Sequence, residues 1–394
     1  MKRGIGGIFS SLSLGGEAVR AFVPTPLPPS PRLEFTDVRR RLLERATIAL
    51  GRLDSIVVLL PDSNLFLYSY VRREAVLSSQ IEGTQSSFSE FLLFELKEAP
   101  GVPFDDAAEV SNYVAALEHG VARLKEGFPL CNRLLREVHG KLLSTGRGSE
   151  KGPGDFRHTQ NWIGGTRPGN AHYVPPPPEQ MEVCLSALEH FFHDVDAPYP
   201  VLLKAALAHV QFETIHPFLD GNGRVGRLLI ALMLHDAGLL SQPLLYLSLY
   251  FKKHREEYYR LLDAVRFEGD WEAWADFFLE GVEQTAGEAV MTAKTLVTLF
   301  NADAIRVQNS GRNASTALRV HQALCKRPVL NIQETIEITG LSFPAINKAM
   351  DTLIKLEIVR EMTGAKRNRV FSYRQYLSLL SEGSEVRKNK QENP

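Results

Sequence analysis

The sequence has 394 residues, of which 45 are Lys or Arg and 46 are Asp or Glu, so the formal net charge is −1. A chain of this length can hold two or three domains, each with its own buried core. Its 44% hydrophobic and 23% charged residues are typical of globular proteins and exclude wholesale disorder. The balanced charge excludes a surface that is basic throughout, as general nucleic-acid binding requires.

Membrane insertion and metal or disulfide frameworks are not expected either. No run approaches the roughly 20 consecutive apolar residues that span a bilayer, and the basic N-terminus is followed only by a short, glycine-broken apolar run. Cys131, Cys184 and Cys325 lie far apart without metal-ligand spacing. We therefore expect a cytoplasmic protein with no membrane partner.

The N-terminal part divides into a tail and a helical region. Residues 1–34 are rich in Gly, Ser and Pro and predict a flexible, extended tail. From residue 35 the apolar spacing becomes helical, with Thr36 as the expected N-cap. A second helix is predicted over 64–81, because Gly83 suits a helix C-terminus. With further helices over 88–96 and 106–125, we expect an N-terminal helical region that spans 35–130.

The middle part, 131–282, is predicted to be a mainly α-helical domain with one β-hairpin. Helices are expected over 131–143, 179–194, 201–211, 223–235, 249–267 and 271–282. Residues 159–178, TQNWIGGTRPGNAHYVPPPP, instead contain two short β-prone pieces around a Gly/Pro/Asn turn. This segment predicts a hairpin flap, which the proline run ends because proline cannot continue a helix.

The C-terminal part indicates a small winged-helix domain. After a helical linker over 283–314, residues 315–380 contain a helix over 332–339, a turn at Gly340, a helix begun by Ser342, and two short strands around Gly364. Residues 381–394 are expected to be a solvated tail. If the domain binds DNA, its phosphate contacts would come from four basic residues: Lys348, Lys366, Arg367 and Arg369. A protein-interaction or dimerisation module is equally compatible with the sequence.

The loop between the two most apolar helices carries the clearest chemical signal, HPFLDGNGRVGR over residues 216–227. Gly221, Asn222 and Gly223 can adopt backbone angles that turn successive N–H groups inward into an anion-binding nest. A helix begins directly afterwards and adds N–H donors with a partial positive charge. Arg224 and Arg227 are three residues apart, so they share one helix face and offer two forks for phosphate oxygens.

Two further residues complete a phosphate-transfer site. Asp220 supplies a hard carboxylate oxygen beside the phosphates, which is the kind of ligand that Mg²⁺ takes together with water and phosphate oxygens. His216 precedes the nest, and an imidazole, which ordinarily titrates near about pH 6.5, can accept a proton from an incoming hydroxyl. The loop therefore predicts a polyphosphate cradle with a metal ligand and a general base.

At these residues the chain resembles the Fic (filamentation induced by cAMP) family, whose motif HPFx[D/E]GNGRxxR is matched at every specified position. The resemblance extends over about residues 20 to 280. It implies a protein adenylyltransferase that moves AMP from Mg-ATP to a Ser, Thr or Tyr hydroxyl of a target protein, with the protein itself among the candidate targets. His216 would be the base, Asp220 the Mg²⁺ ligand, Arg224 a contact of the inner phosphates, and Arg227 the holder of the γ-phosphate.

The resemblance also assigns the remaining site residues. Nucleotide contacts are expected from Gly221, Asn222, Gly223, Arg224, Val225, Gly226 and Arg227. Tyr250 and His254 would line the adenine pocket. The flap would hold the target backbone as an added strand, mainly through Ile163, Gly164, Gly165 and Thr166.

A second motif of the same family predicts a built-in inhibitor. Ser78, Glu82 and Gly83 match the pattern [S/T]xxxE[G/N], and the Ser and Glu are four residues apart on one helix face. The resemblance implies that Glu82 pairs with Arg227. That carboxylate would occupy the group needed for the γ-phosphate and repel the phosphate itself, so basal activity should be low. Relatives also use this glutamate to remove AMP, and the sequence leaves that role open.

Two alternatives compete with AMP transfer. One is a winged-helix transcription regulator whose Fic-like domain only senses a nucleotide. The other is transfer of a different group, such as phosphate. The intact base and both arginines favour AMP transfer, because a sensor does not need His216. Homodimer formation and the identity of the target are left open by the sequence.

Overall fold

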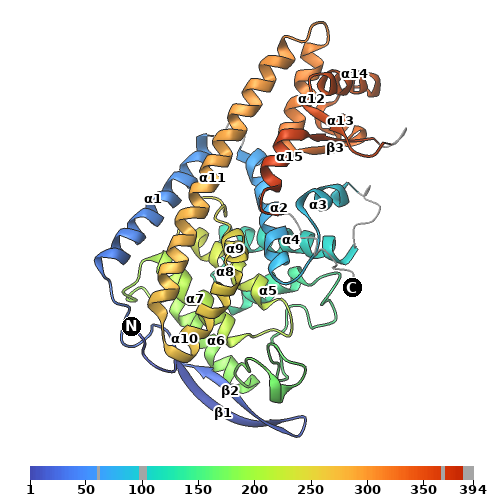
Figure 1. Cartoon of the computed structure of the whole chain (residues 1–394). Helices are drawn as coiled ribbons and strands as arrows, with labels where there is room; N and C mark the ends of the chain where they lie inside the picture. The colour runs from blue at the N-terminus through green and yellow to red at the C-terminus, as the bar shows by residue number, and fades with distance from the viewer. Residues whose placement is uncertain (60–62, 97–103, 365–368, 385–394) are drawn as a thin grey trace, which may run out of the picture. The chain divides into compact units, whose positions relative to one another are not determined.

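The computed structural model describes residues 1–59, 63–96, 104–364 and 369–384 (Figure 1). The chain divides into two compact units, residues 1–54 with 111–286 and residues 55–110 with 287–394. The divisions fall inside three helices: α1 (Asp37–Leu59), α4 (Phe104–Lys125) and α11 (Trp271–Gln308). The mainly helical fold class is confirmed. Within the described part, no helix combines the length and the hydropathy that crossing a membrane requires.

The first unit is built around an antiparallel helix pair, α7 (Val201–Ile215) and α8 (Asn222–Asp236), which lie side by side in Figure 1. Nearly every side chain of both helices is buried, so they form the core rather than a surface layer. The other α-helices that lie wholly within this unit are α5 (Asn132–Leu142), α6 (Pro178–His193), α9 (Ser248–Lys253) and α10 (Arg255–Glu268), and parts of α1, α4 and α11 belong to it as well. The run expected as one helix over 249–267 is therefore two helices, which divide at His254.

The prediction of a flexible N-terminal tail is wrong for residues 7–24. These residues form an antiparallel β-hairpin of β1 (Gly7–Leu14) and β2 (Glu17–Pro24), and Gly15 and Gly16 make its turn with positive φ. In β2 the buried Val19 and Ala21 alternate with exposed neighbours on one face, and Phe22, on the other face, is also in the core, only 1% exposed. The Gly and Ser content concealed this period-two pattern, which is the stronger signal. The N–H of Phe22 donates to the Val174 carbonyl at 2.8 Å, so β2 lies against the flap.

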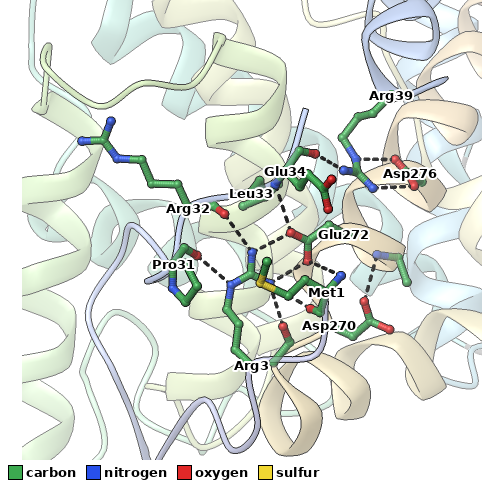
Figure 2. Close-up of polar contacts among 12 residues, drawn as sticks. Met1, Arg3, Pro31, Arg32, Leu33, Glu34, Arg39, Asp270, Glu272 and Asp276 are labelled. Carbon is green, nitrogen blue, oxygen red and sulfur yellow. Dashed lines mark hydrogen bonds and ion pairs between the residues drawn. The ribbon is translucent and has the colours of Figure 1, made fainter. Parts of the chain in front are cut away.

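The segment after this hairpin is also ordered, through the cluster in Figure 2. The Arg3 guanidinium donates to both carboxylate oxygens of Glu272 at 2.6 Å and to the carbonyl of Pro31 at 2.7 Å. Burial alone would raise the pKa of Glu272, but the hydrogen bonds from Arg3 and from the N–H of Glu34 lower it to about 2. The N-terminal segment is thus tied to the first turn of α11.

The second unit contains the winged-helix domain, as predicted. Its elements are α12 (Ala314–Lys326), β3 (Val329–Asn331), α13 (Ile332–Thr339), α14 (Phe343–Lys355), β4 (Val359–Glu361), β5 (Val370–Tyr373) and α15 (Arg374–Ser381), and its antiparallel sheet has the order β3-β5-β4. Gly340 ends α13 with φ +65°. Ser342 precedes α14 as expected, although its side chain makes no capping hydrogen bond. Lys366 and Arg367 lie outside the described residues, so DNA binding stays a prediction, as does homodimer formation.

Two helices of the predicted N-terminal region belong to this same second unit. They are α2 (Ser63–Ile81) and α3 (Phe88–Glu95), and they pack against α15, while α2 also packs against α12. The chain order therefore differs from the spatial grouping: the helix that carries the predicted inhibitory motif is part of the unit that contains the winged helix.

Candidate active site

The motif loop begins where α7 ends. His216 is the C-terminal cap residue of that helix and adopts the left-handed conformation, with φ 50° and ψ 61°. Its N–H still donates to the Phe212 carbonyl at 2.9 Å. A non-glycine residue in this region is uncommon, and such residues persist where surrounding contacts hold them. The left-handed backbone at His216 thus ends α7, and the motif loop follows it.

The loop is held by the side chain of Asn222. Its Oδ1 accepts from the Phe218 N–H and its Nδ2 donates to the Phe218 carbonyl, both at 2.8 Å. Asn222 is 2% exposed, so this pair of bonds is shielded from water. Gly221 precedes it with φ 79°, a conformation that favours glycine. The Asn222 side chain thus stabilises the loop. The first N–H groups of α8 would complete the anion-binding nest that the sequence predicts.

The two motif arginines and Asp220 gather at the start of α8. Arg224 and Arg227 are 1% and 5% exposed, so they are already desolvated. Nη2 of Arg224 lies 3.4 Å from Oδ1 of Asp220, which also accepts from the Gly221 N–H at 2.5 Å. The Asp220 side chain keeps 37% of its surface exposed. One accessible carboxylate oxygen beside buried guanidinium groups fits a metal ion that completes its shell with phosphate and water.

Two residues near Asp220 were not found by reasoning from the sequence. His139 of α5 is fully buried, and its ring stacks on Phe218 with a centroid distance of 3.7 Å and an interplanar angle of 11°. Gly148 has φ +86°, and a Cβ there would lie 2.7 Å from Oδ2 of Asp220. Both are far from the motif in sequence, so no local pattern identifies them.

The structure gives Val225 and Gly226 packing contacts. Val225 is fully buried, and its N–H donates to the Gly221 carbonyl at 3.0 Å. Gly226 faces α7, where an added Cβ would lie 2.3 Å from Oε1 of Glu213. Its carbonyl accepts from Nδ1 of His209 at 2.9 Å. Gly226 thus lies against α7, and nucleotide contacts from Val225 and Gly226 stay a prediction.

The predicted flap is present as a minimal hairpin. Ile163 and Tyr173 form an antiparallel bridge, with the Ile163 N–H donating to the Tyr173 carbonyl at 2.8 Å, and a 3₁₀ turn (Pro168–Asn170) forms its tip. Gly164 and Gly165 both have positive φ. The N–H of Thr166 donates to Oδ1 of Asn170 at 3.0 Å within the flap. Three of the four residues predicted to contact the target are exposed: Gly164, Gly165 and Thr166.

Comparison with known proteins identifies the two helical regions. Residues 40–122 match the Fic/DOC family N-terminal domain, and residues 129–234 match the Fic/DOC family domain. Two segments of the chain therefore match Fic/DOC family domains. The second match contains the whole motif loop, from His216 to Arg227.

Similar proteins carry the name protein adenylyltransferase Fic. The relative from Culex quinquefasciatus is 32% identical over 211 residues, which is 52% of this chain and 39% of the relative. The relative from Drosophila virilis is 28% identical over 263 residues, 64% of this chain and 50% of the relative. The chain thus spans about half or less of the length of these relatives.

Solved structures show the same fold. A Fic family protein from Desulfovibrio desulfuricans G20 superposes with a TM-score of 0.58 and 20% identity, covering 88% of this chain and 98% of that one. Residues 134–508 of Fic-1 from C. elegans superpose with a TM-score of 0.52 and 22% identity, covering 66% of this chain and 73% of that one.

The two residues expected to line the adenine pocket, Tyr250 and His254, differ in how deeply they are buried. Tyr250 is 6% exposed and packs on Phe277, at a ring-centroid distance of 4.9 Å; burial raises its pKa to about 12. His254 is exposed and lies 4.5 Å from the Tyr250 ring. Tyr250 is therefore part of the core, whereas His254 is exposed, and their contact with adenine stays a prediction.

The predicted inhibitory motif lies at the end of α2. Ser78 is fully buried, whereas Glu82 follows the helix and is exposed. The N–H of Glu82 donates to the Ser79 carbonyl at 3.0 Å, and Gly83 turns the chain with φ 102°. Directly afterwards, Oγ1 of Thr84 donates to Oε2 of Glu109 at 3.0 Å. Residues 78–83 thus form the end of a helix, with Glu82 exposed just after it, and the pairing of Glu82 with Arg227 stays a prediction.

Proposed function

We propose that this chain is a protein adenylyltransferase, which transfers AMP from ATP to a hydroxyl side chain of a protein. The observation that carries the proposal is the loop between α7 and α8, where His216, held in the left-handed conformation, is followed within eleven residues by the buried Arg224 and Arg227. A base and a desolvated phosphate cradle on one short loop are what phosphoryl-type transfer needs, because positioning and charge stabilisation supply most of the catalysis.

The reaction follows from the roles of these groups. The target hydroxyl gives its proton to the imidazole of His216 as its oxygen bonds to the α-phosphorus. The bond between the α-phosphorus and the bridging oxygen breaks, and pyrophosphate leaves towards Arg224 and Arg227. The products are an AMP-bearing side chain and pyrophosphate, with the proton on His216. The N–H groups at the start of α8 hold the phosphate oxygens throughout.

Asp220 would hold Mg²⁺ bound to the phosphates of ATP. Its accessible carboxylate and its nearness to Arg224 support this assignment. When bound, the ion would neutralise phosphate charge as the leaving group forms. Within the described residues no cluster of three or more His, Cys, Asp or Glu side chains could hold a metal alone.

The decisive test uses ATP labelled at the α-phosphate or at the γ-phosphate in parallel reactions with the full chain. Only the α-label should appear on protein, and His216→Ala should abolish it. Label from the γ-position would instead establish a kinase. Retention of α-label by the His216→Ala variant would reject the role of the imidazole.

We also propose that Glu82 inhibits the enzyme by pairing with Arg227. The buried Arg227 can hold one anion at this position, so a carboxylate there excludes the γ-phosphate. Glu82→Gly should raise α-label transfer by orders of magnitude. Glu82→Gln, which keeps the shape and removes the charge, should also raise it. Equal labelling by the wild type and both variants would reject the inhibitory role while leaving the transferase proposal intact.

A further inference from the structure

Arg157 connects the flap to the motif loop. It is 2% exposed, and its guanidinium donates from Nε to the His216 carbonyl at 3.0 Å, from Nη1 to the Thr159 carbonyl at 3.2 Å, and from Nη2 to the Pro176 carbonyl. Its own N–H donates to the carbonyl of Pro217 at 2.9 Å. Thr159 and Pro176 lie on the two arms of the flap, so one side chain ties both arms to the residue that bears the imidazole.

Of the basic side chains, only arginine can donate to these three carbonyls from one planar group. In the described part of the chain the hydrogen-bond partners of the guanidinium are all carbonyl oxygens, and burial lowers the pKa of Arg157 to about 10. A lysine in this place would have a single nitrogen on a flexible four-carbon stem and could not present three donors in a fixed fork. Breaking the contact would leave three carbonyls, one in a buried contact and two in part-buried contacts, to be satisfied by other donors.

We infer that Arg157 is a positioning residue that sets the distance between the flap and His216. The inference rests on the proposed function, in which the flap holds the target backbone and His216 receives its proton. A displacement of about 1 Å between a bound substrate and a catalytic group can cost on the order of 100-fold in rate. The nucleotide cradle is held separately, by Asn222 and the start of α8. Loss of Arg157 should therefore impair transfer and spare ATP binding.

The test compares Arg157→Lys and Arg157→Met with Arg136→Lys, all in the Glu82→Gly background. Arg136 also donates to a backbone carbonyl, that of Gly154, but its side chain is 48% exposed and touches neither flap arm. The Arg157 variants should reduce α-label transfer at saturating ATP by about 10- to 100-fold, with the Kd for ATP changed less than threefold. Arg136→Lys should behave as its parent.

Two outcomes would overturn the inference: unchanged transfer by the Arg157 variants, or a loss of ATP affinity as large as the loss of transfer. Amide exchange gives a readout that does not need activity, since the Ile163 amide, bonded within the flap, should exchange faster in Arg157→Lys. Unchanged exchange would count against the inference even if labelling fell. An inactive Glu82→Gly parent would reject the proposed function instead, and the exchange experiment would still decide the role of Arg157.

A second, independent observation concerns the helix that carries the inhibitory motif. Three side chains of α2 are bonded to the C-terminal segment 374–384. Oγ of Ser69 and the hydroxyl of Tyr376 are 2.9 Å apart and buried. Nη2 of Arg73 donates to the Glu382 carbonyl at 2.7 Å, and Nε2 of Gln80 donates to the Ser384 carbonyl at 2.9 Å.

These contacts cover one face of α2 and approach the motif directly. Residues 69, 73 and 80 follow helical spacing, so their side chains lie on the same side. Gln80 is two residues before Glu82, and its Nε2 also donates to the Ser86 carbonyl at 3.0 Å, across the turn at Gly83. The same segment contacts α3, where Ser89 and Ser381 hydroxyls are 3.3 Å apart. Residues 374–384 therefore contact the chain on both sides of Glu82 in the sequence, at Gln80 before it and at Ser89 after it.

We propose that residues 374–384 act as a clamp that holds Glu82 in its inhibitory position, so that a change in the winged-helix domain alters AMP transfer. The proposal rests on the inhibitory role of Glu82. Each neutral hydrogen bond of this kind makes a small net contribution to stability, about 0.5–1.5 kcal/mol. Loss of one bond shifts a two-state equilibrium by about threefold to tenfold.

The test is an epistasis experiment on the full chain. Tyr376→Phe removes only the hydroxyl that meets Ser69, and Ser69→Ala removes its partner. Each should raise α-label transfer by about 3- to 10-fold in the wild-type background. Neither should change transfer in the Glu82→Gly background, where the inhibitory carboxylate is gone. Tyr259→Phe, at an exposed tyrosine of the first unit, is the matched control and should leave both backgrounds unchanged.

The clamp is overturned if Tyr376→Phe and Ser69→Ala leave wild-type labelling unchanged, or if they raise it equally in the Glu82→Gly background. A gain that is absent in that background cannot come from a general change in stability. If Glu82→Gly itself labels no better than the wild type, the inhibitory proposal fails first. Amide exchange within α2 then still shows whether Tyr376→Phe loosens the helix, and unchanged exchange would overturn the clamp.

Discussion

Nε2 of His139 donates to the Asp220 carbonyl at 3.1 Å, across 81 residues of sequence. The direction of this bond follows from the other ring nitrogen, because Nδ1 lies 2.9 Å from the Gly154 N–H, which can only donate. Burial lowers the pKa of His139 to about 4, so the ring is neutral and carries its proton on Nε2. His139 thus fixes the backbone of the residue expected to bind Mg²⁺.

Because each ring nitrogen makes its own hydrogen bond, two conservative replacements of His139 should have different effects. Glutamine can keep a donor near the Nε2 position, whereas asparagine can keep an acceptor near Nδ1 and loses the bond to Asp220. Groups that orient a metal ligand typically contribute 10- to 100-fold to affinity or activity. In the Glu82→Gly background, His139→Asn should therefore raise the Mg²⁺ concentration that gives half-maximal α-labelling by at least about tenfold. His139→Gln should raise it less, and the reverse order would contradict the assigned bond.

Gly226 provides a packing prediction with a matched control. A Cβ at Gly226 would meet Glu213 at 2.3 Å and His209 at 3.3 Å, between the paired helices α7 and α8. Overpacking of this kind costs about 1–3 kcal/mol, so Gly226→Ala should lower the free energy of unfolding by that amount in urea titration. Gly287, inside α11, has open space at its Cβ position. Gly287→Ala should be neutral or stabilising by up to about 1 kcal/mol, and equal destabilisation by both would contradict the packing account.

The sequence predicted those features that depend on neighbouring residues. The period of apolar residues predicted α7 and α8, and the loop between them carried its own chemistry in twelve consecutive residues. Thr36 was predicted as an N-cap and accepts from the Arg39 N–H at 3.3 Å. The contacts of Arg157, His139 and Gly148 join segments that are distant in the chain, so no local pattern predicts them. The N-terminal hairpin was not predicted, because the Gly, Ser and Pro content of residues 1–34 was given more weight than the alternation of apolar residues in the strand.

His209 should make stability depend on pH. It is fully buried, its Nδ1 faces the Gly226 carbonyl at 2.9 Å, and its Nε2 faces the Tyr258 hydroxyl at 2.8 Å. Burial lowers its pKa to about 3, whereas an unfolded histidine titrates near about 6.5. The unfolded chain therefore binds a proton first as the pH falls. The stabilisation is complete above about pH 6.5 and is lost towards pH 3, by about 2 kcal/mol between pH 7 and pH 5.

The contribution of His209 can be isolated by comparison with His209→Asn, which keeps a donor near Nδ1 and cannot titrate. Free energies of unfolding are measured by urea titration at pH 7 and pH 5. The wild type should lose about 2 kcal/mol more than the variant over this interval. Equal losses would show that His209 is not kept neutral by burial.

The last prediction concerns Glu17, whose carboxylate lies at the tip of the flap. It accepts from the Arg167 guanidinium and, at 2.7 Å, from the Gly169 N–H, and it is only partly exposed. An ion pair at such a surface contributes little to global stability, about 0–1 kcal/mol. Its effect should instead be local, because it joins the N-terminal hairpin to the turn of the flap. Glu17→Gln should therefore leave the melting temperature nearly unchanged and speed amide exchange at the flap tip.

Glu34→Gln is not a suitable control for Glu17, because the Glu34 backbone belongs to the Glu272 cluster. Glu179→Gln on α6 is better, since it lies in the same unit at a solvent-facing helix start. In Glu17→Gln, exchange at the Gly169 amide should be several-fold faster than in Glu179→Gln, and high salt should reduce the difference by screening the Arg167 pair in the wild type. Identical exchange in the two variants would show that the bridge at residue 163 holds the flap without help from the hairpin.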